Sequence, residues 1–260
     1  MSTFQDKVAL ITGGGSGIGE AVARRIAAAG GRVVVADIDT ENGRRVAEAV
    51  GGHHVQADVA DPAANEAAVA VALERYGRLD IAHLNAGTGT GTLGGPDAAL
   101  DVEAHRRGVS VNLDGVVYGA HAAVPALQAS GGGAILVTAS LAGLIPSPGN
   151  VTYTATKHAV VGVVRSLAPV LTPHHITVNA LCPGFVDTPL VRPLLPALAK
   201  VGLPVDDIMA PDDVAAAAEH VIAEGGTGAA WIVMAGTPPR PYPYYDPLTG
   251  TTVDGPPAAA

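Results

Sequence analysis

Tyr153 and Lys157 are the residues of this sequence whose types and spacing most directly suggest acid–base chemistry. They stand four positions apart at the start of a predicted helix, so their side chains share one face about one turn apart. A tyrosine with the ordinary pKa of about 10 is a poor base at neutral pH, but a nearby ammonium lowers that pKa. The pair is a candidate proton donor and acceptor for an alcohol–ketone couple. The alternative is an ordinary pair on a helix surface.

Two polar residues are candidates to complete this constellation. Ser140 ends a predicted strand, and its hydroxyl could donate to a carbonyl oxygen as negative charge develops there. Asn112 lies inside the predicted helix 100–129, where an asparagine is mildly unfavourable because it competes for backbone hydrogen bonds. The alternatives are a common strand-end serine and, for Asn112, a local kink, a bound water or a solvated helix face.

A glycine-rich turn joins the first predicted strand to an alanine-rich helix. Glycines let the backbone approach a pyrophosphate, and the helix N-terminus supplies N–H donors and the positive end of a dipole. The spacing is Gly-x3-Gly-x-Gly, one residue longer than the usual dinucleotide fingerprint. The alternative is a flexible connection. The candidate cofactor-binding residues in the turn are Gly13, Ser16, Gly17, Ile18 and Gly19.

Asp37 ends the second predicted strand, at the distance from the glycine turn where an acidic residue can hydrogen-bond the adenosine ribose. A carboxylate there would repel a 2′-phosphate. Ile38 follows Asp37, and the glycine turn carries no Arg or Lys, so the sequence favours NAD over NADP as cofactor. The alternative is that Asp37 only caps a turn before Asp39 and Thr40.

Two further strand ends fit the same crevice, because ligands of open parallel sheets bind outside the carboxyl ends of the strands. Asp58 and Val59 follow the third predicted strand, and Asn85, Ala86 and Gly87 follow the fourth. Each segment could instead be a helix cap or a simple turn.

The elements that must position these groups alternate between short apolar strands and longer helical patterns. Strands are predicted at Val8–Thr12, Arg32–Asp37, His53–Ala57, Leu79–Asn85, Gly133–Ala139, Ile176–Leu181 and Ala229–Ala235. Helices are predicted near 17–30, 40–50, 62–77, 100–129, 151–172 and 211–224. This order predicts an α/β protein: one doubly wound Rossmann domain over residues 1–260, with a seven-stranded parallel sheet flanked by helices. Residues 185–210 are expected to form a substrate flap, and residues 236–260 a C-terminal tail or arm.

The composition supports a folded protein and excludes several classes of partner. Of the 260 residues, 48% are hydrophobic and 15% charged, which excludes disorder as the overall description. The net charge of −9 and the lack of a basic stripe argue against nucleic acid. No signal peptide and no membrane span are recognised, and no metal site is predicted. The single cysteine, Cys182, favours a cytoplasmic setting.

In order and spacing, the motifs resemble the short-chain dehydrogenase/reductase family over about residues 5–235. The matching segments are Thr-Gly-Gly-Gly-Ser-Gly-Ile-Gly, Asn-Ala-Gly, Ser140, Tyr153-Thr-Ala-Thr-Lys157 and Pro183-Gly184. Two features depart from the family pattern. Leu84 replaces the first of two asparagines before Ala-Gly, and the tail carries an unusual set of tyrosines, Tyr242, Tyr244 and Tyr245.

The resemblance implies a role for each matched residue. Tyr153 would be the general acid–base, and Lys157 would lower its pKa and hold the nicotinamide ribose. Ser140 would polarise the substrate oxygen, and Asn112 would anchor a water of the proton relay. Asp58 and Val59 would flank the adenine. The residues expected to position the nicotinamide end are Pro183, Gly184, Val186 and Thr188.

The predicted reaction is reversible oxidation of a secondary alcohol to a ketone by NAD⁺. The candidate substrate-lining residues are Leu141, Ala142, Leu144, Val151, Phe185 and Leu190. Their apolar character favours a hydrophobic or neutral substrate, although Arg192 could meet a carboxylate and the apolar residues could serve packing instead. The alternatives are an NADPH-linked carbonyl reductase and a catalytically inactive, dinucleotide-binding regulatory protein. The resemblance also implies a homotetramer or homodimer.

Overall fold

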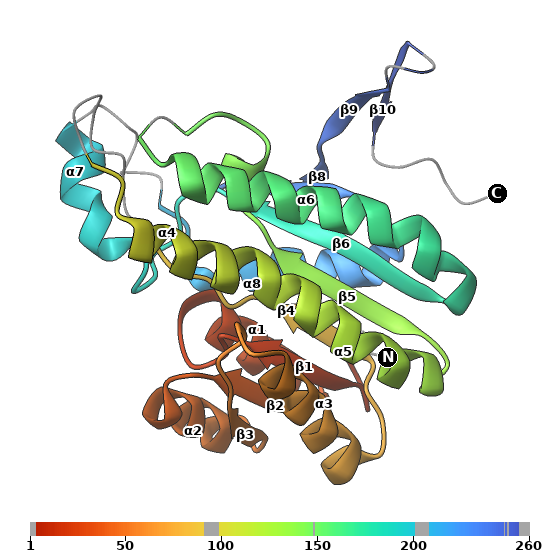
Figure 1. The fold of residues 1–260 in the computed structure, drawn as a ribbon. Helices are drawn as coiled ribbons and strands as arrows, with labels where there is room; N and C mark the ends of the chain where they lie inside the picture. The colour runs from red at the N-terminus through yellow and green to blue at the C-terminus, as the bar shows by residue number, and fades with distance from the viewer. Residues whose placement is uncertain are drawn as a thin grey trace.

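The computed structural model describes residues 4–90, 99–147, 149–200, 208–246, 248 and 250–254. Its strands are β1 Val8–Thr12, β2 Arg32–Asp37, β3 His53–Gln56, β4 Ile81–Leu84, β5 Gly133–Thr138, β6 Ile176–Pro183, β7 Ala230–Val233, β8 Arg240–Pro241, β9 Pro243–Asp246 and β10 Thr251–Asp254. Its α-helices are α1 Gly17–Ala28, α2 Thr40–Ala49, α3 Pro62–Tyr76, α4 Val102–Val109, α5 Gly115–Ala129, α6 Val151–Leu171, α7 Leu195–Lys200 and α8 Pro211–Glu224. Figure 1 shows the central sheet with helices on both faces.

The central sheet has the strand order β3-β2-β1-β4-β5-β6-β7-β8, and β1 to β7 are parallel. The α/β Rossmann prediction is therefore confirmed. The predicted count of seven strands is wrong by one, because the chain after β7 turns back and Arg240–Pro241 pairs antiparallel with that strand. The strand order reverses between β1 and β4. Crevices at such reversals, at the carboxyl ends of the strands, are the usual ligand sites of open parallel sheets.

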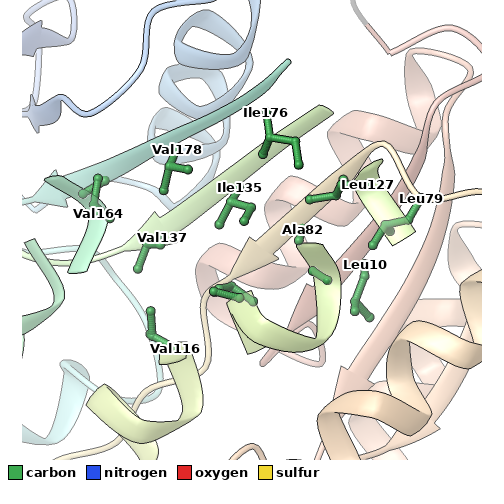
Figure 2. Packing of buried hydrophobic residues seen from close by; sticks show 14 of the residues in the cluster. Leu10, Leu79, Ala82, Val116, Leu127, Ile135, Val137, Val164, Ile176 and Val178 are labelled. Carbon is green, nitrogen blue, oxygen red and sulfur yellow. The ribbon is translucent and has the colours of Figure 1, made fainter. Parts of the chain in front are cut away.

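Apolar residues pack into one layer on each face of the sheet. All five residues of β1 are buried, which suits a strand covered from both sides. Figure 2 shows part of one layer, where Val116 and Leu127 of α5 lie among Ile135, Val137 and Val178. Burial of each such side chain stabilises the fold by about 1.5–3 kcal/mol. The layer on the opposite face brings α1, α2 and α8 against the same strands.

Residues 100–129 do not form the continuous helix that the sequence predicted. A π-helical turn at Ser110–Asp114 separates α4 from α5. Asn112 lies in this turn, and its side-chain amide hydrogen-bonds both backbone groups of Thr88. Such turns are often found at functional sites. The wider turn directs this buried side chain away from its own helix and toward the loop after β4.

The segments predicted to form a substrate flap and a C-terminal tail both contain regular structure. In residues 185–210, Val186 bridges to Met209, and the short helix α7 lies between them in the sequence. Residues 201–207 of this segment lie outside the described part of the chain. In the tail, β9 and β10 form an antiparallel hairpin that extends from the body of the molecule (Figure 1), and residues 255–260 are likewise outside the description. Among the described residues, no helix has the length and apolar character to cross a membrane.

Candidate active site

The glycine turn packs so closely that side chains would not fit at several of its positions. A Cβ atom at Gly13 would lie 2.8 Å from the Cα of Ala86, and one at Gly19 would lie 2.2 Å from the Gly13 carbonyl oxygen. Gly13 and Gly17 also have positive φ angles of 62° and 53°, which favour glycine. The Ser16 side chain makes no capping hydrogen bond at the start of α1. The amides of the first turn of α1 are therefore open to an anion such as a pyrophosphate.

Asp37 lies at the carboxyl end of β2, directly behind the glycine turn. One carboxylate oxygen accepts a hydrogen bond from the Gly15 N–H at 2.8 Å, and the other accepts one from the Asp39 N–H at 2.9 Å. Asp37 and Ile38 both line the cleft that begins at the glycine turn. The carboxylate is thus fixed at the end of the cleft where an adenosine ribose is expected.

A cation from another element, Arg45, lies beside the glycine turn, although the turn itself carries no Arg or Lys. Arg45 of α2 donates to the Gly15 carbonyl oxygen at 3.0 Å and forms an ion pair with Glu20 at 2.7 Å. The hydrogen bond with Arg45 is the main cause that lowers the pKa of Glu20 to about 2. Arg45 is therefore held by Glu20, a carboxylate that it shares with Arg24 at 2.7 Å.

Asn85, at the end of β4, ties three strand ends together. Its side-chain NH2 donates to the carbonyl oxygens of Thr12 and Gly13 at 3.0 and 3.2 Å, and its Oδ1 accepts from the Thr138 hydroxyl at 2.9 Å. The Thr12 hydroxyl accepts from the backbone N–H groups of Asn85 and Ala86. The carboxyl ends of β1, β4 and β5 are held in register at the strand-order reversal.

Tyr153 and Lys157 lie in the first two turns of α6, which places both against the end of β5. The Lys157 ammonium lies 5.6 Å from the Tyr153 ring centroid and donates to the Thr138 carbonyl oxygen at 2.8 Å. Lys157 is only 3% exposed, and burial lowers its pKa to about 8. Burial also raises the pKa of Tyr153. This direction is opposite to the sequence-based expectation, because desolvation of a phenolate outweighs the favourable interactions around it.

Ser140 follows β5 and faces the tyrosine. Its Oγ accepts a hydrogen bond from the Ala142 N–H at 3.1 Å, and a hydrogen bond with Tyr153 partly opposes the rise in the tyrosine pKa. Asn112 lies behind this group: its Oδ1 would be 3.5 Å from a Cβ at Gly87, and the Lys157 Nζ would be 3.8 Å from the same point. The four residues predicted from sequence therefore converge around the loop that follows β4.

A single cleft with a volume of about 320 Å³ runs from Asp37 to Tyr153 in the described part of the chain. Most predicted cofactor residues line it: Gly13, Ser16, Gly17, Ile18, Asp37, Asp58, Val59, Asn85, Ala86, Gly87, Tyr153, Lys157, Pro183, Gly184, Val186 and Thr188. Gly19 does not line the cleft but packs against the Gly13 carbonyl group. Asn112 is connected to the cleft by its hydrogen bonds to the Thr88 backbone. The sequence did not single out these further lining residues: Ala57, Thr88, Arg107, Val111, Thr138, Ala139, Pro189 and Val191.

Arg107 is the most informative of the missed residues. Its guanidinium lies 3.5 Å from the Asp58 carboxylate, whose other oxygen accepts from the Ala60 N–H. Arg107 is one helical turn before Val111, which also lines the cleft, but it is five residues before Asn112, so helical periodicity from Asn112 would not have found it.

The substrate end of the cleft is less completely defined. Of the six predicted lining residues, Leu190 lines the cleft. Leu141 lies at its margin, since its Cδ1 would be 3.6 Å from a Cβ at Gly184. The other four, Ala142, Leu144, Val151 and Phe185, are not among its lining residues. Met234, which the sequence did not suggest, lies against Gly184 beside Leu141.

Arg192 is already paired, which bears on the expectation that it could meet a substrate carboxylate. Its guanidinium forms a two-point ion pair with Asp187, and this hydrogen bonding lowers the pKa of the aspartate. Among the described residues, no three His, Cys, Asp or Glu side chains gather in a way that could hold a metal ion.

The fold and the cleft together define a class. A glycine turn at a helix N-terminus, a strand-end aspartate and a tyrosine–lysine pair on one cleft are the parts of an α/β dinucleotide-dependent oxidoreductase. A family model described as short chain dehydrogenase matches residues 7–198. The chain therefore belongs to the short-chain dehydrogenase/reductase family, and it is an oxidoreductase that acts on alcohol and ketone groups.

Several relatives are named for activity on ring alcohols. The chain is 37% identical to a cyclohexanol dehydrogenase of Acinetobacter sp. (strain SE19) over 238 residues, which cover 88% of this chain and 94% of the relative. It is 36% identical to a trans-4-hydroxycyclohexanecarboxylate dehydrogenase of Sinomonas cyclohexanicum, with 76% and 79% covered. Among solved structures, a 3-ketoacyl-(acyl-carrier-protein) reductase from Brucella melitensis complexed with NADH superposes with a TM-score of 0.81 and 36% identity, covering 90% of this chain and 98% of that one.

Proposed function

We propose that this chain is an NAD-dependent dehydrogenase of neutral secondary alcohols that uses Tyr153 as its general acid–base. The observation that carries the proposal is that one cleft is lined by the glycine turn and Asp37 at one end and by Ser140, Tyr153 and Lys157 at the other. A bound nicotinamide would accept or donate the hydride in this cleft.

The chain's own residues would bind and polarise the substrate oxygen and move one proton. The Ser140 Oγ accepts from a backbone N–H, which leaves the hydroxyl proton for the substrate oxygen. The raised pKa of Tyr153 keeps the phenol protonated at neutral pH, so it can act as the acid when a carbonyl is reduced. In the oxidation direction the phenolate is required, and the Lys157 ammonium and the Ser140 hydroxyl would stabilise it.

Lys157 and Asn112 would serve this proton transfer from behind. The Thr138 carbonyl holds the Lys157 ammonium close to the tyrosine ring, where it would also meet a ribose hydroxyl. The Asn112 amide is committed to the Thr88 backbone. Asn112 would therefore affect a water of the proton relay indirectly, by holding the loop after β4 in position.

The preference for NAD over NADP is supported by Asp37. A 2′-phosphate would meet a carboxylate whose two oxygens are already fixed by backbone N–H groups, and the nearby cation Arg45 is paired with Glu20. The juxtaposition of two like charges, here the phosphate and the Asp37 carboxylate, disfavours binding by an amount on the order of several kcal/mol.

A neutral ring alcohol is the substrate class that the surroundings favour. The substrate end presents Leu190, with Leu141 and Met234 at its margin, and Arg192 is paired with Asp187. The names of the cyclohexanol and hydroxycyclohexanecarboxylate dehydrogenases point to six-membered rings. Ala142, Leu144, Val151 and Phe185 do not line the cleft, and a role in lining the substrate site stays a proposal for them.

One experiment tests cofactor and substrate together. NAD⁺ and NADP⁺ reduction should be followed over secondary alcohols of graded size, with cyclohexanol compared with a cyclohexanol that carries a carboxylate. We expect turnover with NAD⁺ and the neutral ring alcohol. Faster turnover with NADP⁺ would refute the Asp37 argument, and preference for the carboxylate would refute the argument about Arg192.

We further propose that the chain assembles as a homodimer or homotetramer and resides in the cytoplasm. Exposed apolar side chains on the helix layer of α4, α5 and α6 support assembly, among them Val102, Val117, Val151 and Val170. A single, fully buried cysteine, Cys182, supports a reducing compartment.

A further inference from the structure

His83 is a polar residue at the centre of the sheet that the proposed mechanism does not use. It lies in β4 between Ile11 of β1 and Leu136 of β5, and none of its surface is exposed. Burial lowers the pKa of its imidazole to about 3, so the ring is neutral. A buried polar side chain in such surroundings is unfavourable unless a hydrogen bond compensates for the lost water.

The hydrogen bonds around His83 define which ring nitrogen carries the proton. Nε2 lies 2.9 Å from the Thr138 hydroxyl oxygen, and Nδ1 has no hydrogen-bond partner among the residues that the structure describes. The Thr138 hydroxyl has one proton and donates it to the Asn85 Oδ1 at 2.9 Å. Thr138 must therefore accept from His83, which requires that the proton is on Nε2.

This chain of hydrogen bonds continues to both ends of the proposed cofactor site. Because Thr138 holds the Asn85 Oδ1, the amide NH2 of Asn85 is directed to the carbonyl oxygens of Thr12 and Gly13. The backbone carbonyl of Thr138 receives the Lys157 ammonium. Thr138 thus bonds both Asn85, which holds the glycine turn, and Lys157.

We propose that His83 is a positioning residue for cofactor binding, which acts by donating from Nε2 to Thr138 and so fixes the orientation of Asn85 against the glycine turn. The proposal rests on the dinucleotide site proposed above. A histidine that served only to fill the core would be replaceable by any side chain of similar volume. A positioning histidine requires a side chain that can donate a hydrogen bond.

Two substitutions of similar shape separate these roles. His83→Gln retains an N–H donor in the side chain, whereas His83→Met has nearly the same length without one. NADH binding should be titrated by its fluorescence for the wild-type chain and both variants, and thermal unfolding should be recorded in parallel. We expect His83→Met to weaken NADH binding at least five-fold and His83→Gln to stay within two-fold of wild type.

A Thr138→Val background tests whether His83 acts through Thr138. There, His83→Met should cause no further loss of NADH affinity, because the hydroxyl that it orients is gone. Leu136→Val, next to His83 in the sheet, is the control for a general loss of core packing and should leave the dissociation constant unchanged.

The outcomes are distinguishable. Equal dissociation constants for the Gln and Met variants, or additive losses in the Thr138→Val background, would overturn the role of His83 while the proposed function stands. Failure of the wild-type chain to bind NADH would overturn both. If His83→Met does not fold, ¹⁵N chemical shifts of the imidazole in the wild-type chain decide the question: a proton on Nε2 supports the donor role, and a proton on Nδ1 would overturn it.

Discussion

At the residue scale, the site combines a buried lysine and a partly buried tyrosine, whose pKa values desolvation moves in opposite directions. The pKa of Tyr153 is raised and that of Lys157 is lowered to about 8. Both shifts favour the neutral forms, so the protein holds these groups at the expense of its own stability. Such a conflict between burial and charge is typical of functional sites.

The removal of the phenol tests its proposed role. Tyr153→Phe deletes the acid–base group with little change in volume, so we expect turnover to fall by at least about 10²-fold, the usual contribution of a general acid–base. NADH affinity should change little, because the Lys157 ammonium remains on the Thr138 carbonyl. Steady-state rates and a fluorescence titration measure the two effects. Near-normal turnover in a folded variant would rule out Tyr153.

The stability contribution of Lys157 should depend on pH in a defined window. Its pKa is about 8 in the folded chain against 10.5 in the unfolded chain. Between these values the unfolded chain binds more protons, so the unfolding free energy rises with pH there. At about 1.4 kcal/mol per pKa unit, the gain is on the order of 3 kcal/mol. Urea unfolding should show the unfolding free energy of the wild type rising relative to that of Lys157→Met between about pH 8 and pH 10.5, and a constant difference would contradict the assignment.

At the element scale, the glycine turn and the π-turn both deviate from regular geometry to bring backbone groups together. In the first, the absence of side chains lets β1, α1 and the loop after β4 approach one another. In the second, the wider helical turn brings Asn112 to the Thr88 backbone. Each deviation positions groups that line the cleft.

Gly19→Ala tests the close approach in the glycine turn. The added Cβ would lie 2.2 Å from the Gly13 carbonyl oxygen and 2.7 Å from the Asn85 side-chain nitrogen, so the turn must shift. We expect NADH affinity to fall by at least about ten-fold, or about 1.4 kcal/mol.

Gly162→Ala is the matched control. Gly162 lies in α6, where a Cβ would meet no atom within 4 Å. The change should stabilise the helix by about 0.5–1 kcal/mol and leave NADH binding unaltered. Equal NADH affinity of the two alanine variants would show that the packing of the turn is not what binds the cofactor.

At the scale of the whole molecule, the tail completes the edge of the sheet far from the glycine turn. The Tyr242 N–H donates to the Ala230 carbonyl oxygen at 2.7 Å. Tyr244 packs under Arg165 of α6, whose guanidinium lies 3.9 Å from the ring centroid. Past this contact, the rest of the β9–β10 hairpin extends away from the body of the molecule (Figure 1). Two-stranded hairpins are only marginally stable alone.

Truncation separates the two parts of the tail. A chain that ends at Gly236 loses β8 and both tyrosines, so its melting temperature should fall clearly below that of the full chain. A chain that ends at Asp246 keeps them and should melt close to the full chain. NADH affinity should persist in both, because the glycine turn is on the other half of the sheet. Unchanged melting of the shorter chain would contradict a structural role for β8.

Light scattering of the same three chains tests assembly. The proposed dimer or tetramer predicts two or four times the chain mass of 25.9 kDa for the full chain. A monomer at micromolar concentration would refute assembly. A change in the number of subunits already in the chain that ends at Asp246 would place the segment with β10 in the interface.

The sequence by itself determined the order and class of the elements and most of the residues that line the cleft. The reason is physical: buried parallel strands require short apolar runs, a backbone that meets a phosphate requires glycine, and proton transfer requires titratable side chains at fixed helical spacing. These requirements are local, so Gly13, Asp37, Asn85 and the Tyr153–Lys157 pair could be found from spacing and type.

The tertiary structure decided what depends on contacts between distant segments. The sequence could not predict that Arg107 faces Asp58, that Arg45 pairs with Glu20, or that the chain after β7 adds an eighth strand. Nor could local spacing predict that burial would raise the pKa of Tyr153. Burial, ion pairing and edge-strand pairing arise only when remote residues share one environment, and that environment exists only in the folded chain.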